Sequence, residues 1–181
     1  MALVVEDGTG KADAESYISV ADASTYHTAR GNAAWAGLAS DTIREQMLRK
    51  ATDYMTATYG ERWKGVRVGA VQMLDWPRAY VERESVYDVT TVPPSNIDGN
   101  LWWPSDEVPE PVRRACAELA LRAIDGDLAV DLDPPVTSER VGPIAVTYAE
   151  GARQNVVYRL VGGLLSQFLK DAGGVIRVKR S

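Results

Sequence analysis

The segment that most constrains the fold follows two prolines, at positions 109 and 111. Apolar or small side chains then recur at helical spacing: Val112, Ala115, Cys116, Leu119, Ala120 and Ala123. Prolines are tolerated in the first turn of a helix, where the missing N–H has no intrahelical partner, and Gly126 is placed to end this helix. Because most side chains on the apolar face are small, we expect a second helix to approach closely. The pattern therefore predicts close helix–helix packing at this segment.

Two helices are predicted on the N-terminal side of this segment. Ser19, with Asp22 three residues on, resembles a capping box and begins a helix over about 20–30 that ends at Gly31. Ser40 or Thr42 begins the next helix, which Gly60 closes. Its helical spacing is carried by Ile43, Met47, Ala51, Tyr54, Met55 and Thr58.

Two shorter helices complete the prediction. One over 69–74 must stop near Trp76, because Pro77 moves the residue before it out of the helical region. Asn155 is placed to cap the last helix. That helix carries Val157, Leu160, Leu164, Leu165 and Phe168.

The remaining segments predict short strands and one domain. Residues 80–107 are expected to form an ordered loop or a small strand pair that projects from the core. Residues 136–148 alternate around Gly142 and Pro143 as a β-hairpin does. We predict a mainly α fold, a compact bundle of four to five helices with this hairpin and extended N- and C-terminal strands. Residues 1–172 form one helical domain, and residues 173–181 form an extended C-terminal arm.

The inventory of reactive side chains argues against an enzyme. The chain has one histidine, His27, and one cysteine, Cys116, too few for a zinc site or a disulfide. A phosphate-binding loop is absent, since Gly8-Thr9-Gly10-Lys11 is too short for one. The acids Asp125, Asp127, Asp131 and Asp133 lack the glycine and glutamate positions of a calcium loop. We expect no catalytic residue, no cofactor and no metal.

The net charge of −5 predicts weak nonspecific binding to duplex DNA. No run of about 20 apolar residues predicts a membrane span, and no secretory signal is apparent at the N-terminus.

One stretch interleaves aromatic rings with cations in a way that admits two interpretations. Its candidate residues are Arg62, Trp63, Lys64, Trp76 and Arg78. Such side chains can stack on bases and neutralise phosphates. Alternatively, the tryptophans are core or interface anchors with arginines at their rim. We favour this alternative because a stacking platform also needs a cationic groove, and acids lie nearby. The pair Trp102 and Trp103 admits the same two interpretations, and in a polar loop it favours a protein interface.

Several segments occur in a recognisable order. They are residues 14–23, Arg49 to Tyr54, Trp63-Lys64-Gly65, Gln72-Met73-Leu74-Asp75-Trp76-Pro77-Arg78, Val108 to Val112 and Glu139 to Ile144. This order resembles the phage family of DnaT-like single-stranded-DNA-binding proteins, whose members look similar to head–tail connector subunits of long-tailed phages. The resemblance covers nearly the whole chain. It implies a helical core, a ring usually of twelve subunits beneath the portal, and no cofactor or catalytic residue.

From this resemblance we expect a structural virion protein, a head–tail connector or adaptor subunit. It would form a homo-dodecamer that joins the phage portal protein to a tail-side connector, a stopper or a tail-terminator protein. Packaged DNA would pass through its lumen without specific binding, which suits an acidic wall. The protein would be assembled in the host cytoplasm, lie at the head–tail interface of the virion and contact no membrane. The alternative is a single-stranded-DNA-binding protein of replication.

The C-terminal arm is the main candidate for a contact with the portal or a neighbouring subunit. An extended arm can add a strand to the sheet edge of a partner. The candidate interface residues are Val175, Ile176, Arg177, Val178, Lys179 and Arg180, together with Trp102 and Trp103. The alternative is a small intrachain sheet that includes residues 2–5.

Overall fold

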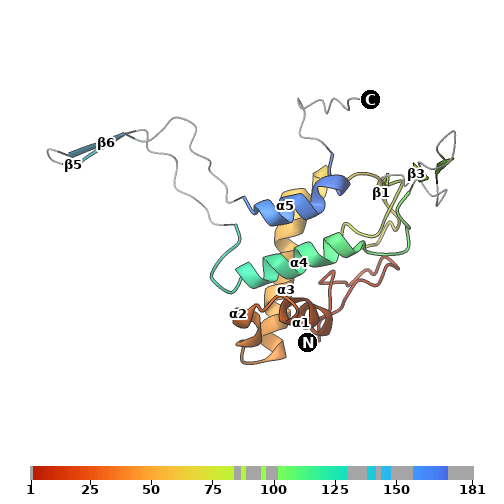
Figure 1. Ribbon diagram of the computed structural model, residues 1–181, viewed down its shortest axis with the longest axis horizontal. Helices are drawn as coiled ribbons and strands as arrows, with labels where there is room; N and C mark the ends of the chain where they lie inside the picture. Colours follow the sequence, from red (N-terminus) through yellow and green to blue (C-terminus); the bar gives the residue numbers. More distant parts are fainter. Residues whose placement is uncertain are drawn as a thin grey trace.

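The computed structural model describes residues 2–83, 102–129 and 157–170, and the backbone of four short strands outside these ranges. The elements are mainly α-helical, with two-stranded antiparallel sheets, which confirms the predicted fold class (Figure 1). In chain order they are α1 (Val20–Thr28), α2 (Ala33–Ala36), α3 (Asp41–Tyr59), η1 (Gly60–Arg62), β1 (Val66–Arg67), β2 (Arg78–Ala79), β3 (Tyr87–Asp88), β4 (Ser95–Asn96), α4 (Glu110–Arg122), β5 (Ser138–Val141), β6 (Ile144–Thr147), α5 (Arg159–Leu165) and η2 (Ser166–Phe168).

Helix α4 forms the centre of the helical core, as its apolar pattern predicts. It packs against α3, α1 and α5, and Figure 1 shows it crossing in front of α3 with α1 below and α5 above. The Thr52 hydroxyl of α3 lies 3.5 Å from the Cys116 sulfur of α4. The small residues of α4 therefore allow the close helix contact that the sequence predicts. The fully buried residues of α4 are Val112, Ala115, Cys116, Ala117, Leu119 and Ala120.

The ends of α1 and α3 follow their capping patterns. Ser19 Oγ accepts a hydrogen bond from the Asp22 backbone N–H at 3.0 Å and donates to the Asp22 carboxylate at 2.7 Å. Gly31 follows α1 with a φ of 68°, a conformation that glycine adopts without steric penalty. Ser40 caps α3 by accepting from Ile43 N–H at 3.4 Å.

The helix predicted over 69–74 is wrong, because a side chain takes over the local hydrogen bonding. Gln72 is buried, and its Oε1 accepts from Gly69 N–H at 3.1 Å. Its Nε2 donates to the carbonyl oxygens of Leu74 at 2.8 Å and Pro77 at 3.0 Å. This network holds a series of bends where the sequence predicts a short helix.

Helix α2 was not predicted from the sequence. It has four residues and no side-chain cap at its start. The Arg44 guanidinium of α3 stabilises its other end by donating to the carbonyl oxygens of Trp35, Ala36 and Leu38. A tertiary contact of this kind leaves no periodic signal in a short segment.

The last helix begins later than expected, at Arg159, and the proposed cap Asn155 lies outside the described residues. Val161, Leu165 and Phe168 are buried, whereas Val157 and Leu160 are exposed. The predicted apolar face was therefore partly wrong, because Val157 precedes the helix and Leu160 lies on its outer side.

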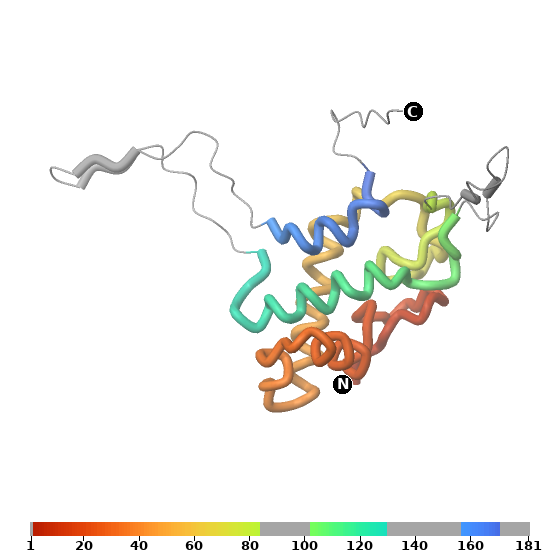
Figure 2. The backbone as a smooth tube through the Cα atoms, viewed as in Figure 1, coloured from red at the N-terminus to blue at the C-terminus, as the bar shows by residue number. Residues whose placement is uncertain are grey.

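Two of the predicted β elements are present, and the predicted C-terminal strand lies outside the described residues. β5 pairs with β6 in antiparallel register from Ser138↔Thr147 to Val141↔Ile144, which confirms the hairpin. β3 and β4 form the small strand pair expected within residues 80–107. At the N-terminus a single parallel bridge joins Val5 to Ser16. Figure 2 shows this N-terminal segment beside the 61–79 segment. Met73 N–H of the 61–79 segment donates to Lys11 O of the N-terminal segment at 2.9 Å.

Among the described residues, no helix combines the length and apolar character that crossing a membrane requires.

Candidate nucleic-acid interface

Trp63 and Trp76 belong to the core. Both have 0% exposed surface, and their ring centroids lie 5.8 Å apart in an edge-to-face arrangement. Trp63 Nε1–H donates to the Asp75 carboxylate at 3.2 Å, and Trp76 packs edge-to-face against Phe168. Neither ring can stack on a base, so these two tryptophans are structural anchors, the interpretation that the sequence favours.

Arg78 is also structural. Its side chain is 7% exposed, and its guanidinium donates to three backbone carbonyl oxygens: Lys64 at 2.7 Å, Asp75 at 3.1 Å and Gly65 at 2.9 Å. Burial lowers the pKa of this guanidinium and raises the pKa of the neighbouring Asp75 carboxyl. Arg78 therefore fixes the turn that carries Lys64, and it is not available to DNA.

Four other cations lie around this turn, and we call Arg62, Lys64, Arg67 and Lys170 the basic surface. Their backbones are joined, because Lys64 N–H donates to Phe168 O at 2.8 Å and Lys170 N–H donates to Arg62 O at 2.7 Å. Arg67 lies opposite Arg78 in the β1–β2 ladder. Lys64 Nζ and Lys170 Nζ donate to the backbone carbonyls of Gln167 and Glu61.

The cations of the basic surface have no ionic partner in the described part of the chain. No carboxylate there lies within 4.0 Å of their side-chain nitrogens, and every ion pair that the structure shows involves other residues. Arg62 lies over the ring of Tyr59, 5.8 Å from its centroid. Residues 61–83 contain five Lys or Arg and three Asp or Glu, in a chain whose net charge is −5. A local positive surface is therefore present on an acidic protein.

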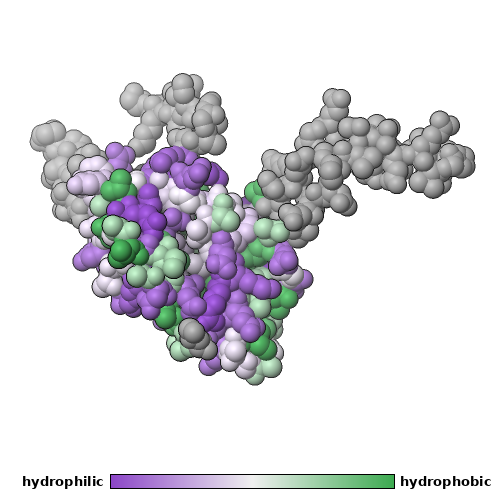
Figure 3. Space-filling model, turned by 180° about the vertical axis from the view of Figure 1, so that it is seen from behind, coloured by the Kyte–Doolittle hydropathy of each residue, from purple (hydrophilic) through white to green (hydrophobic). Residues whose placement is uncertain are grey.

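Two exposed aromatic rings adjoin the basic surface at the end of the β1–β2 ladder. Tyr80, directly after β2, is 71% exposed, and Trp102 is 43% exposed. Their ring centroids lie 6.1 Å apart with an interplanar angle of 89°. Val66, the ladder partner of Ala79, and Val68 are also exposed. Seen from behind in Figure 3, hydrophobic and hydrophilic side chains alternate at this end of the molecule, on the left of that view.

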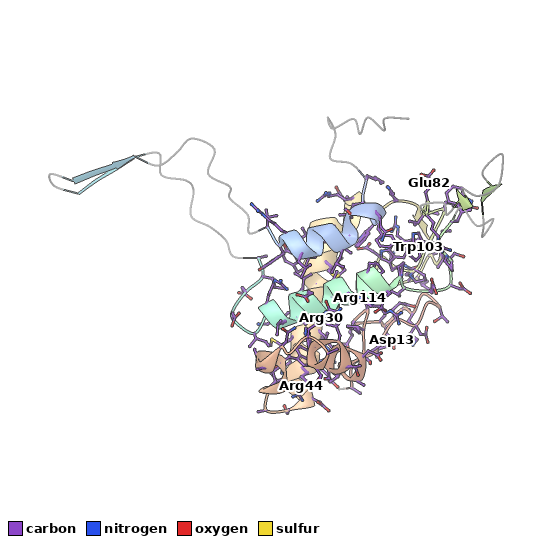
Figure 4. All side chains as sticks on the ribbon, in the orientation of Figure 1. Asp13, Arg30, Arg44, Glu82, Trp103 and Arg114 are labelled. Carbon is purple, nitrogen blue, oxygen red and sulfur yellow. The ribbon has the colours of Figure 1, made fainter. Side chains whose placement is uncertain are left out.

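Trp102 and Trp103 admit the same interpretations from the sequence, but their side chains differ in burial. Trp103 is half-buried, its ring packs 5.2 Å from Phe168, and Arg83 lies over it. Glu82 bridges to Trp102, and Trp103 N–H donates to Val81 O at 2.9 Å. Figure 4 shows Glu82 and Trp103 close together at this end of the molecule, far from Arg44. Trp103 anchors the segment, and Trp102 faces solvent.

A second cluster of arginines lines a groove of about 300 Å³ between α1 and the start of α4. Its cations are Arg30, Arg113 and Arg114, and Figure 4 shows Arg30 and Arg114 near one another. Glu110 pairs with both Arg113 and Arg114 at 2.9 Å. Arg30 covers the ring of Tyr26 at 3.6 Å from its centroid. The polar groups of this groove are already engaged within the chain.

His27 and Cys116 are both fully buried. The His27 ring lies 3.1 Å from Ala117 O and 3.0 Å from Asn32 Nδ2, and burial lowers its pKa. Burial also raises the pKa of the Cys116 thiol, which lies near Ser16 and Thr52. Across the described ranges no three His, Cys, Asp or Glu side chains gather as a metal site does. Neither residue is exposed to a substrate.

Tyr80 and Lys170 were missed as candidates from the sequence. Lys170 is distant in the chain and joins Arg62 only through the Trp63↔Leu169 bridge. Tyr80 follows a two-residue strand and belongs to no motif. No local pattern identifies either residue, because their neighbours are set by the tertiary fold.

The whole chain, residues 1–181, matches the family described as "Putative DnaT-like ssDNA binding protein". The chain belongs to this DnaT-like family. No curated protein and no solved structure matches it. Membership confirms the family resemblance that the segment order suggests.

The expected connector function is corrected by this match. The family is described by DNA binding and not by head–tail connection or portal binding, so the finding favours the alternative of a single-stranded-DNA-binding protein. The acidic net charge led the sequence interpretation away from DNA, because it averages over the basic surface. The subunit number, the partner proteins and the location in a virion stay predictions, as does the absence of enzymatic activity.

The arm residues proposed as an interface for this DnaT-like protein lie outside the described residues. These are Val175, Ile176, Arg177, Val178, Lys179 and Arg180.

Proposed function

We propose that this protein binds single-stranded DNA through the basic surface. The observation that carries the proposal is that Arg62, Lys64, Arg67 and Lys170 are grouped without carboxylate partners in the described chain. Lysine and arginine side chains gain most from a phosphate when no internal carboxylate competes for them. The description of the family supports the same function.

The fold supplies a rigid base for these side chains. Arg78 and Gly65 fix the turn before β1 from inside, and the buried Trp63 lies between Arg62 and Lys64 in the chain. Gly65 has a φ of 67°, and a Cβ there would lie 2.2 Å from Ala79 O. Only glycine fits this turn, so the spacing between Lys64 and Arg67 is held by backbone packing.

Binding should be strongly dependent on salt, because it depends on release of counterions from the phosphates. For single strands the logarithm of the binding constant falls with the logarithm of salt by roughly 0.7 per phosphate contacted. The remainder of the acidic chain repels DNA, so binding should be local and should weaken steeply above physiological ionic strength.

The test is fluorescence anisotropy of a labelled oligothymidylate over a range of salt concentrations. The variant R62Q/K64Q/R67Q should lose at least about tenfold in affinity at low salt and lower the salt slope by about 2. The matched control R30Q/R113Q/R114Q removes the same charge from the groove, and its affinity should stay within about threefold of the unchanged protein. Equal losses in both variants, or no binding by the unchanged protein, would contradict the proposal.

A further inference from the structure

The backbone at Tyr80 is unusual. Among the described residues, it alone combines a side chain with a positive φ, at 58°. This left-handed region is unfavourable for a bulky residue, whereas glycine adopts it readily. The Tyr80 ring itself is mostly exposed. The conformation must therefore be imposed by the packing of the neighbouring backbone.

Close packing on both sides enforces this conformation. Val81, the next residue, is fully buried and its carbonyl accepts from Trp103 N–H. On the other side, a Cβ at Gly65 would lie 2.2 Å from Ala79 O and 2.8 Å from Val81 Cγ2. The chain must return Val81 to the core directly after the β2 ladder, and the left-handed step at Tyr80 turns its ring outward.

The Tyr80 and Trp102 rings have a geometry that suits a nucleobase. They are 6.1 Å apart and nearly perpendicular, at 89°. A base that stacks flat on one ring meets the other edge-to-face, and aromatic groups favour both arrangements. Arg67 lies on the paired strand opposite Arg78, which is two residues along the chain from Tyr80, so a cation is present on the same ladder.

We propose that Tyr80 and Trp102 form a base-stacking site that makes the basic surface selective for unpaired bases. This inference rests on the proposed function and adds the part of the ligand that is recognised. In a duplex each base is already stacked between neighbours, so only an unstacked base can reach a ring face. The ligand is a single strand with exposed bases, and the contact is tolerant of sequence, since every base has a π-face.

The experiment compares three probes of equal length: an oligothymidylate, an abasic sugar–phosphate oligomer and a duplex. The abasic oligomer keeps the phosphates and lacks every base. Unchanged protein should prefer the oligothymidylate over the abasic oligomer by about tenfold or more. The variants Y80A and W102A should remove this preference while binding to the abasic oligomer stays the same. The conservative variants Y80F and W102F should keep the preference.

Tryptophan fluorescence gives an independent readout. Trp102 is exposed, whereas Trp35, Trp63 and Trp76 are buried. Oligothymidylate should quench emission in the unchanged protein and should do so far less in W102F. The abasic oligomer should cause little quenching in either protein.

The variant Y80G separates the role of the ring from its strain. It should raise the urea midpoint of unfolding, because glycine relaxes the left-handed backbone. It should also lose the preference for bases. A gain in stability with the preference intact would overturn the assignment of Tyr80.

The outcomes distinguish this inference from the proposed function. If Y80A/W102A keeps the base preference, the stacking site is wrong although DNA binding stands. If the unchanged protein binds none of the probes, the proposed function fails. If the double variant changes sedimentation but no DNA affinity, the aromatic corner is a protein contact and the inference is overturned.

Discussion

The basic surface and the α1–α4 groove are built from the same kinds of side chain, yet they differ in how these are paired. In the groove, Glu110 holds Arg113 and Arg114, and Arg30 covers the face of Tyr26. At the basic surface, the cations have no carboxylate partner in the described residues and the Tyr80 ring is mostly exposed. Local pairing, and not the number of arginines, separates a surface that can take phosphate from one that is already neutralised.

Secondary structure explains this difference. Helix α4 places Glu110 three and four residues before Arg113 and Arg114, so all three side chains lie on one face. The irregular segment after η1 has no such spacing, and its acids are diverted. Asp75 is buried against Trp63, and the exposed Glu82 forms no ion pair with the cations of the basic surface. An irregular backbone therefore leaves cations exposed where a helix would have paired them.

Removing the buried support of the basic surface should have the largest effect. R78M leaves three carbonyl oxygens without their donor and removes one of the two arginines that favour the charged form of buried Asp75. We expect a loss of about 3 kcal/mol or more in the free energy of unfolding, measured by urea denaturation.

The ladder supplies a matched control for this variant, since Arg67 is the register partner of Arg78. R67M changes the same charge at an exposed position and should alter stability by less than about 0.5 kcal/mol while weakening DNA binding. Similar stability losses in R67M and R78M would show that the contrast between a structural and a functional arginine is wrong.

The α1–α4 region should respond to pH through His27, the one histidine of the chain. Burial lowers its pKa in the folded state, where its ring bonds to Ala117 O and Asn32. Between the lowered pKa and the usual value near 6.5, the unfolded state binds more protons. Stability should therefore fall as the pH drops below about 6.5, by at most about 1.4 kcal/mol per pH unit.

Urea midpoints at pH 7.5 and pH 5.5 test this for the unchanged protein and for H27Q. The variant should be less stable at pH 7.5, because it loses the ring contacts, but it should show a smaller difference between the two pH values. An unchanged pH dependence in H27Q would assign the effect to other groups, such as the carboxyls.

The helical part of the fold could be predicted because its signals are local. Each of three signals involves residues only a few positions apart: the apolar face of α4, the Ser19 cap of α1 and Gly31 after α1. The 69–74 segment misled although its contacts are also local, because the Gln72 side chain replaces the backbone hydrogen bonds of a helix.

The site could be predicted only in part. Arg62 and Lys64 were identified because they interleave with aromatic residues, but burial decides what each aromatic residue does. Trp63 lies in the core although its chain neighbours are charged, and Trp102 faces solvent although its chain neighbours are Leu101 and Trp103. Lys170 reaches the surface through a bridge between distant segments. Exposure and long-range pairing are tertiary properties that local composition does not encode.

The smallest expected effect comes from releasing the groove arginines from their partner. If the ion pairs with Glu110 prevent the groove arginines from binding phosphate, E110Q should create a weak second phosphate site. It should then raise oligothymidylate affinity by about twofold at low salt. The gain is small because exposed ion pairs contribute little and salt screens the added attraction.

The control D53N removes one exposed negative charge from α3 and changes the net charge equally. A gain in E110Q that exceeds the gain in D53N supports local pairing as the deciding property. Equal gains would mean that net charge alone sets the affinity, and the contrast between the two regions would then lose its basis.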